Sequence, residues 1–366
     1  MSKARELSQR AGVDGALSNR NLIINGAMQV AQRGTSHTLA SNNYGSLDRW
    51  NGSGFSGPTC TMEQSTVAPA NFKNSLKFTV TTGASVDATD YSDVRQYIEG
   101  NNVSHLKWGT ADAQDVTVSF WVRCSATGTF AVSICNSSYT RNYPATYVIN
   151  SADTWEYKSV TISGDTSGTW LNDGGVGLRL VFDLGVGSTY SSTTGQWSSG
   201  VYFGGSGVTK LAATTGATWY ITGVQLEVGD TATPFEHRSY GQELALCQRF
   251  FCTSGGPVVP QRTGYAADLF LEGIGAVYTD SFAYSNAISF PCPMRTSPTV
   301  TIVAPSLSSA NNQAAIYSRN GGWNTCDATT PNTGPYGMML DLRDNGGFAG
   351  RDSCLYFVGW YADAEL

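Results

Sequence analysis

Apolar and polar side chains alternate residue by residue over many short stretches of this sequence. A β-strand points successive side chains to opposite faces, so a period of two indicates a strand with one buried face. Residues 178–184 alternate in this way. The clearest stretch is 116–124, in which the apolar positions are Val116, Val118, Phe120, Val122 and Cys124. Further strands are expected near 22–30, 75–81, 93–98, 128–135, 145–150, 155–163 and 218–228.

Turn-forming residues, not helices, separate these strands. The cluster Asn172-Asp173-Gly174-Gly175 is typical of a tight turn. The stretch 185–216 is rich in Ser, Thr and Gly and predicts a long excursion loop. Many short strands without an intervening helical pattern favour an all-β jelly roll or sandwich over a parallel βαβ sheet.

Two short segments carry a helical pattern instead. Residues 2–12 place three small or apolar residues on one stripe, and a second stripe runs through 239–251. The first stripe consists of Ala4, Leu7 and Ala11, and the second of Tyr240, Leu244, Cys247 and Phe251.

Alternation returns after the second helix, at 288–302 and 355–361, which indicates a second β domain. We therefore expect an N-terminal segment 1–19, a jelly roll over 20–237, a linker helix within 238–252 and a smaller distal β-sandwich over 253–366.

Composition and charge exclude several classes of partner. The chain has 366 residues, only 14% of them charged, and a formal net charge of −6. A weakly acidic chain is a poor match for a phosphate backbone, so we expect no nucleic acid partner. No apolar run approaches the roughly 18 residues of a membrane span. The first ten residues have no apolar core, so we expect no secretory signal and a chain made in a cytoplasm.

The cysteines and histidines point to no metal chemistry. None of the eight cysteines forms a C-x-x-C pair. We expect them to be small buried groups in strands. The three histidines, His37, His105 and His237, are not spaced for a shared metal, so we expect neither a metal nor a cofactor.

Motifs of catalysis are also missing. The glycine-rich run 52–57 is followed by Pro58 and a strand pattern, not by a helix that could hold a pyrophosphate. No nucleophile elbow or P-loop lysine occurs. Asp341 and Asp344 could form a glycosidase pair, but the turn at 345–347 favours a hairpin cap. We expect no enzyme.

Binding is the better-supported class, because Trp and Tyr rings offer flat apolar faces to sugars. The stretch from 317 to 336 combines aromatic rings with polar side chains. The alternative is that Trp323 fills the core of its own sandwich and binds no ligand. Its candidate glycan-binding residues are Tyr317, Arg319, Trp323, Asp327 and Tyr336. Four other tryptophans, Trp50, Trp121, Trp155 and Trp219, lie in or beside strands and are core candidates.

Several longer motifs resemble bacteriophage tail-fibre and virion structural proteins. The stretch 21–29, followed by Gln32-Arg33-Gly34 and later Leu47-Asp48-Arg49-Trp50, resembles the opening of many such proteins. Residues 224–236 are similar to the closing strand of their jelly roll. Residues 240–251 and 290–300 resemble their linker and a recurring distal motif.

The resemblance implies a carbohydrate-binding-module-like jelly roll, usually trimeric, attached to a virion by its N-terminus. Some such jelly rolls hold a structural calcium, to which Glu227 could contribute. No full ligand set is visible, so no metal is assigned. The resemblance does not indicate which residues of this sequence would bind a ligand.

We therefore expect a virion structural protein, a tail fibre or adhesin that contacts a host-surface glycan. The alternatives are a purely structural fibre or head-decoration protein and a surface-polysaccharide depolymerase. The 2–12 stripe is the expected attachment to other virion proteins, and the 239–251 stripe the expected homotrimer interface.

Overall fold

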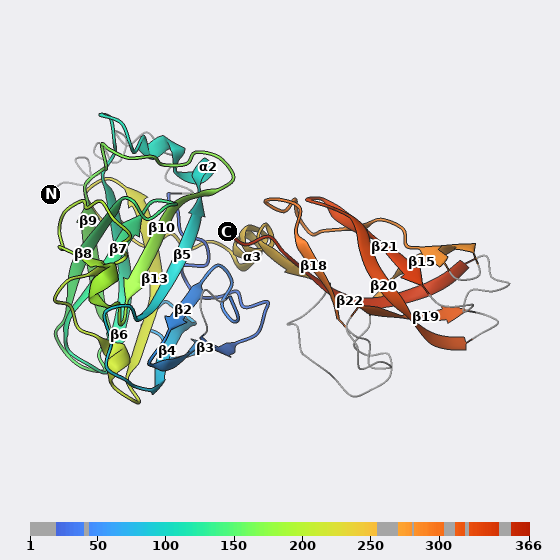
Figure 1. Cartoon of the computed structure of the whole chain (residues 1–366), viewed down its shortest axis with the longest axis horizontal. Coiled ribbons are helices and arrows are strands. Elements are labelled where there is room, and N and C mark those ends of the chain that lie inside the picture. Colours follow the sequence, from blue (N-terminus) through green and yellow to red (C-terminus); the bar gives the residue numbers. More distant parts are fainter. Residues whose placement is uncertain are drawn as a thin grey trace. The chain divides into compact units, whose positions relative to one another are not determined.

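The computed structural model describes residues 20–39, 44–254, 270–279, 282–303, 312–318, 322–343 and 353–366. Nearly all of the regular structure is β, as predicted (Figure 1). The chain divides into two compact units. Among the described residues, the first contains 20–31, 35–243 and 366, and the second contains 32–34 and those within 244–365. The expected attachment stripe, Ala4, Leu7 and Ala11, lies outside the described residues.

The first unit is a sandwich of two antiparallel sheets, which confirms the predicted jelly roll. One sheet has the order β1-β3-β4-β13-β6-β9, with bounds Ser36–Thr38, Thr59–Ser65, Ser75–Thr82, Thr218–Val228, Val116–Cys124 and Glu156–Ile162. The other has the order β2-β5-β10-β7-β8, with bounds Asn51–Phe55, Tyr91–Glu99, Val176–Asp183, Gly128–Cys135 and Asn142–Ile149.

Short elements connect these strands. The helices α2 (Gly100–Val103) and η1 (Ser104–Leu106) follow β5. The predicted excursion after β10 contains only the short elements η2 (Ser188–Tyr190), β11 (Ser191–Ser192), β12 (Gly204–Gly205) and η3 (Leu211–Ala213).

The core between the sheets follows the alternation in the sequence. The apolar positions of β6 are fully buried, while Arg123 on the same strand is half-buried. Trp50 and Trp219 are core residues, as predicted. Trp121 and Trp155 are not: both are half-buried and absent from the core. Trp121 alternates with the buried residues of β6 and therefore lies on the outer face.

The predicted strand at 22–30 is wrong. This segment is buried but irregular, because the Asn25 side chain takes the hydrogen bonds that a neighbouring strand would otherwise make. Its Oδ1 accepts from the backbone N–H groups of Gln29 and Val30, at 2.8 and 3.0 Å. Its Nδ2 donates to the carbonyls of Val30 and Asp48. Asn25 itself adopts a positive φ of 58°.

The second unit is a single antiparallel sheet that closes on itself. Its order is β14-β22-β15-β16-β21-β20-β19, and β22 pairs in addition with β19. The strands β17 (Ile288–Ser289) and β18 (Thr299–Val303) pair with β21 and β22. The other bounds are Phe251–Thr253, Ser353–Asp363, Phe270–Thr279, Phe282–Tyr284, Gly337–Arg343, Gly322–Gly334 and Gln313–Ser318.

The helix α3 spans Tyr240–Gln248, close to the predicted 239–251. Its apolar stripe does not form one exposed seam. Tyr240 is 56% exposed, whereas Cys247 is fully buried within the single chain. Phe251 lies in β14 and packs under the Arg33 guanidinium, 3.7 Å from its ring centroid. Only Tyr240 and the half-buried Leu244 are left for the predicted trimer interface.

The prediction that the cysteines are buried in strands holds in part. Of the seven whose burial is described, all but Cys292 are buried, and Cys292 is half-buried. Cys247 lies in α3 and Cys292 lies outside any strand, whereas the other five lie in strands.

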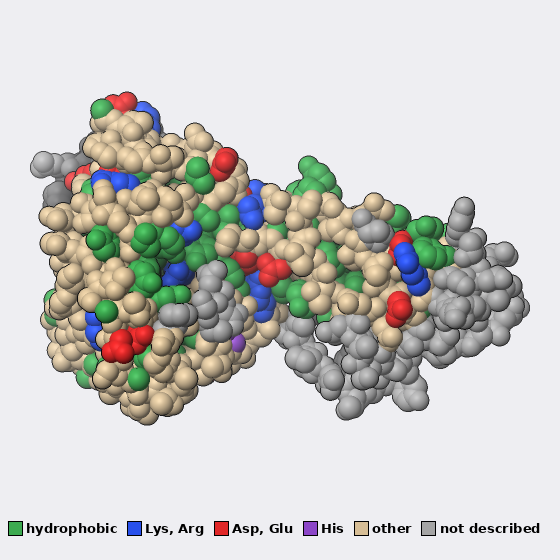
Figure 2. Space-filling view, viewed as in Figure 1, with side chains coloured by type: hydrophobic (Ala, Val, Ile, Leu, Met, Phe, Trp, Pro, Cys, Tyr) green, Lys and Arg blue, Asp and Glu red, His purple; other side chains and the backbone are tan. Residues whose placement is uncertain are grey.

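The surface carries few charges. On the face shown in Figure 2, Lys, Arg, Asp and Glu side chains are scattered among uncharged groups. Among the helices of the described ranges, none is both long and apolar enough to span a membrane.

Candidate functional site

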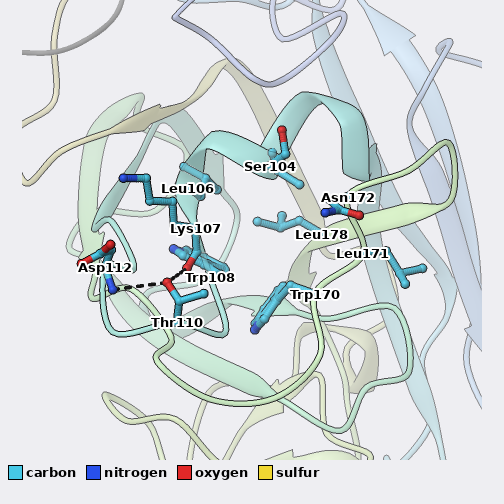
Figure 3. Close-up of a pocket in the computed structure, with 11 residues that line it drawn as sticks. Ser104, Leu106, Lys107, Trp108, Thr110, Asp112, Trp170, Leu171, Asn172 and Leu178 are labelled. Carbon is cyan, nitrogen blue, oxygen red and sulfur yellow. Dashed lines mark hydrogen bonds between the residues drawn. The ribbon is translucent and has the colours of Figure 1, made fainter.

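A pocket of about 380 Å³ opens beside α2 and η1 in the first unit (Figure 3). Its apolar wall is formed by Val103, Leu106 and Leu178, and its aromatic surface by Trp108 and Trp170. The polar residues at the pocket are Ser104, Lys107, Thr110, Asp112 and Asn172. We call this site the Trp pocket.

Loops bring the aromatic residues of the pocket together. Trp108 follows η1, Trp170 lies between β9 and β10, and Trp197 lies in the long excursion after β10. The ring centroids of Trp108 and Trp170 are 4.6 Å apart, with an interplanar angle of 79°. Trp197 packs edge-on against both, at 5.5 and 5.7 Å. Near-perpendicular packing suits the ring quadrupoles and rigidifies the cluster.

Both indole N–H groups of the pocket already have partners. Trp108 Nε1 donates to the Gln114 carbonyl at 2.6 Å. Trp170 Nε1 donates to the Asp165 carboxylate at 3.3 Å and to the Ser167 carbonyl at 3.2 Å. The rings are therefore held in place. Trp108 is only 8% exposed and packs into the core, so the half-buried ring of Trp170 offers most of the aromatic surface that a ligand could contact.

The polar residues of the rim differ in what they can still bind. The Thr110 hydroxyl is occupied, since it donates to the Lys107 carbonyl and accepts from the Asp112 backbone N–H. Within the described part of the chain, the side chains of Lys107, Asp112 and Asn172 have no hydrogen-bond partner. A pocket with apolar and aromatic walls and a few convergent polar groups is typical of a small-molecule site.

The predicted glycan-binding residues of the second unit do not form one loop. The stretch from Tyr317 to Asp327 forms the paired strands β19 and β20. Tyr336 lies in the turn after β20 and is 73% exposed. Trp323 lies at the other end of β20, whose 13 residues span about 40 Å at roughly 3.3 Å per residue.

The structure describes only some of the other predicted glycan-binding residues. Asp327 is exposed, and its carboxylate accepts a hydrogen bond from Gln313 Nε2 at 3.4 Å. Tyr317 and Trp323 are register partners at the β19–β20 hairpin. Arg319 lies outside the described residues. Their role in glycan binding stays a prediction.

The candidate catalytic pair is only half described. Asp341 is buried on β21 and lies 3.4 Å from the Arg343 guanidinium. Asp344 lies outside the described residues, as does the turn at 345–347.

The Glu227 carboxylate has protein partners in the place of a metal. It accepts from Thr233 N, Thr233 Oγ1 and Gln225 Nε2 and lies 3.7 Å from Arg20 Nε. Within the described residues, no cluster of three or more His, Cys, Asp or Glu side chains could hold a metal ion.

No pattern in the sequence predicts the Trp pocket. Trp108, Trp170 and Trp197 are far apart in the chain, and no local spacing joins them. One signal was present: each lies outside the predicted strands and stands next to Gly, Ser or Thr, as in Trp108-Gly109-Thr110 and Gly168-Thr169-Trp170. In the structure Trp108 belongs to the core, and Trp170 and Trp197 are partly buried against it, so Trp170 and Trp197 are the ones that keep open surface.

No protein-family model and no curated protein matches this sequence. Solved structures with a similar fold include the enzymatically active domain of bacteriophage CBA120 tailspike protein 4. Its identity is 11% and its TM-score 0.31, over 57% of this chain and 21% of that one. A family 4 carbohydrate-binding module matches at 12% identity and a TM-score of 0.30, over 56% of this chain and 98% of the module.

A third similar structure is the C-terminal family 22 carbohydrate-binding module of Clostridium thermocellum Xyn10B. It matches at 10% identity and a TM-score of 0.30, over 60% of this chain and the whole of the module. At these identities and scores, no function is transferred from these structures to this chain.

Proposed function

We propose that this chain is a structural protein of a bacteriophage virion, a tail fibre or adhesin, and that its jelly roll binds a host-surface glycan in the Trp pocket. The geometry of that pocket carries the binding part of the proposal. The motifs at 21–50, 224–236, 240–251 and 290–300 support the virion part.

A sugar ring has an apolar face of C–H groups and a rim of hydroxyls. Trp170 supplies a half-buried ring that the buried Trp108 holds in place, so a ligand that stacks there need not order it first. The unpartnered side chains of Lys107, Asp112 and Asn172 can address the hydroxyls. The pocket volume lies within the roughly 300–1,000 Å³ that small-molecule sites occupy.

Two variants test the pocket on an array of bacterial surface polysaccharides. Trp170→Ala removes the half-buried ring of the pocket, while Trp155→Ala removes a half-buried tryptophan that packs on Tyr220, away from it. We expect Trp170→Ala to weaken binding to the retained polysaccharide at least tenfold and Trp155→Ala to leave it within about twofold. Equal binding by the wild type and Trp170→Ala would place the site elsewhere.

The same array separates the alternatives. A purely structural fibre or decoration protein would retain no polysaccharide. A depolymerase would release reducing ends from a retained polysaccharide, and we expect no release. Electron microscopy of virions labelled with an antibody to this protein tests the virion assignment, and we expect label on the tail.

A further inference from the structure

A second hollow, of about 520 Å³, lies on the outer face of the six-stranded sheet. It shares no lining residue with the Trp pocket. Trp121 on β6 and Tyr157 on β9 are direct register partners there. Their ring centroids are 5.5 Å apart and the rings are inclined by 55°. Tyr157 is 46% exposed, so the pair offers open ring surface to a ligand. We call this site the sheet-face groove.

A bulge in β13 builds the wall of the groove. The register shifts between Thr222 and Gln225, and Gly223 takes a positive φ of 63°. A Cβ at Gly223 would meet the Phe72 ring at 2.6 Å, so glycine allows Phe72 to pack over the strand. Phe72 in turn contacts Phe235 and His237, with centroids 5.2 and 5.3 Å away.

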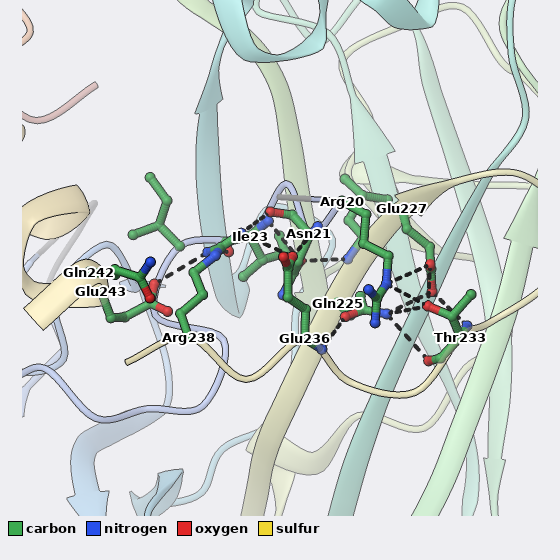
Figure 4. A network of polar contacts seen from close by, with 12 residues as sticks. Arg20, Asn21, Ile23, Gln225, Glu227, Thr233, Glu236, Arg238, Gln242 and Glu243 are labelled. Carbon is green, nitrogen blue, oxygen red and sulfur yellow. Dashed lines mark hydrogen bonds and ion pairs between the residues drawn. The ribbon is translucent and has the colours of Figure 1, made fainter. Parts of the chain in front are cut away.

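A polar network holds that wall against the sheet (Figure 4). Thr233 N donates to Glu227 at 2.8 Å, and Glu236 N donates to Gln225 Oε1 at 2.8 Å. Gln225 is fully buried and Glu227 almost fully. Because these bonds fix the backbone on both sides of Phe235, the groove exists before any ligand arrives.

The groove has no charge but retains spare hydrogen-bonding groups. None of the described residues that line it is Lys, Arg, Asp or Glu. In the described chain, Trp121 Nε1 and the hydroxyls of Ser119 and Tyr157 have no hydrogen-bond partner. Ser119 is 2% exposed and lines the groove. Aromatic faces beside neutral donors and acceptors match an uncharged sugar ring, whereas an acidic sugar would meet no Lys or Arg side chain.

We propose that the sheet-face groove is a second saccharide site, which takes uncharged pyranose rings and makes the jelly roll bivalent. The proposal shares its ligand class with the proposed function but depends on different residues. Two sites on one domain raise the avidity for a repeating polymer through effective concentration.

Calorimetry on the full chain tests the groove with cellohexaose and xylohexaose as neutral probes and hexagalacturonate as the acidic probe. The Trp170→Ala background disables the Trp pocket. In that background we expect at least one neutral hexasaccharide to bind and added Tyr157→Ala to weaken it at least tenfold. Tyr157→Phe should retain most of the affinity. Val148→Ala is the matched control, since Val148 on β8 is 47% exposed and lies outside the groove.

Three results would overturn the second site. One is unchanged affinity on addition of Tyr157→Ala when the melting temperature is also unchanged. Another is hexagalacturonate binding at the groove as tightly as the neutral probes. The third is that neither neutral probe binds the Trp170→Ala chain. None of these results would contradict the proposed function, which depends on a different observation: polysaccharide binding on the array that is lost in Trp170→Ala.

Discussion

The Nε1 of Trp170 donates a hydrogen bond to the Asp165 carboxylate, 3.3 Å away. Asp165 is almost fully buried, and its two oxygens also accept from Arg141 at 2.7 and 2.6 Å. Its backbone carbonyl accepts from Gly109 N, next to Trp108. One residue therefore positions both tryptophans of the Trp pocket: Trp170 through its side chain, and the loop of Trp108 through its backbone.

Asp165→Asn should destabilise the jelly roll. The change removes the charge that pairs with Arg141, and hydrogen bonds to charged groups contribute about 1.5–3 kcal/mol each. We expect a loss of about 2 kcal/mol in the free energy of unfolding, measured by denaturant titration, and weaker binding in the Trp pocket. Asp153→Asn is the control. It removes a pair with Arg123 in which the Asp153 side chain is 56% exposed, and should cost less than about 1 kcal/mol. Equal losses for the two variants would contradict the role of Asp165.

The thiols should differ sharply in reactivity. Burial raises the pKa of the Cys60 thiol to about 11 and that of Cys135 to about 12, so almost none of either is thiolate at pH 8. Burial also raises the pKa of Cys292, but this residue is only half-buried, and the Arg249 charge acts in the opposite direction. Among the described cysteines, we expect Cys292 to be alkylated first in the native protein. Mass spectrometry of iodoacetamide-treated protein provides the measurement, and earlier labelling of Cys60 or Cys135 would contradict it.

The sequence predicted the central strands of the jelly roll well. β6, β7 and β13 have the bounds that their patterns indicated, although almost every residue of β7 and β13 is buried, on both faces of the sheet. The segment around Asn25 has a strand-like pattern but forms no strand, since apolar residues are also buried where a side chain replaces the sheet hydrogen bonds. Pattern alone does not distinguish the two cases.

The residues of the two proposed binding sites were harder to predict than the sheets. Trp121 is a large aromatic residue of the kind usually found in a core. It stands between two core-facing positions of β6, however, so its side chain points to the outer face of the sheet. Trp108 and Trp170 meet only because two loops of the jelly roll converge. Their shared partner Asp165 is a single carboxylate in a Gly- and Ser-rich turn, so nothing local marks it.

The homotrimer stays a prediction, with a smaller expected interface. Of the four stripe residues, Cys247 and Phe251 are buried within the chain, so Tyr240 and Leu244 are the ones able to reach a neighbour. We expect light scattering at micromolar concentration to give about three times 39.0 kDa. Tyr240→Arg should shift this mass toward the monomer without lowering the melting temperature of the jelly roll. A stable mass near 39.0 kDa for the wild type would exclude the trimer.

Removal of residues 1–19 should leave a folded protein that no longer enters virions. We expect the jelly roll to fold without this segment, because the first described residues are already hydrogen-bonded to the rest of the domain. Asn21 N donates to Glu236 at 2.9 Å, Asn21 Oδ1 accepts from Leu226 N at 3.1 Å, and Arg20 bonds to Thr233 and Pro234. If the 2–12 stripe docks on another virion protein, burial of Leu7 contributes about 1.5–3 kcal/mol per copy.

Leu7→Asp should therefore reproduce the effect of the deletion, whereas Ser8→Asp, which places the same charge beside the stripe, should not. Copy number in purified particles is the readout, with an unchanged melting temperature as evidence of folding. Particles that carry the truncated protein at the normal copy number would show that attachment depends on residues after 19.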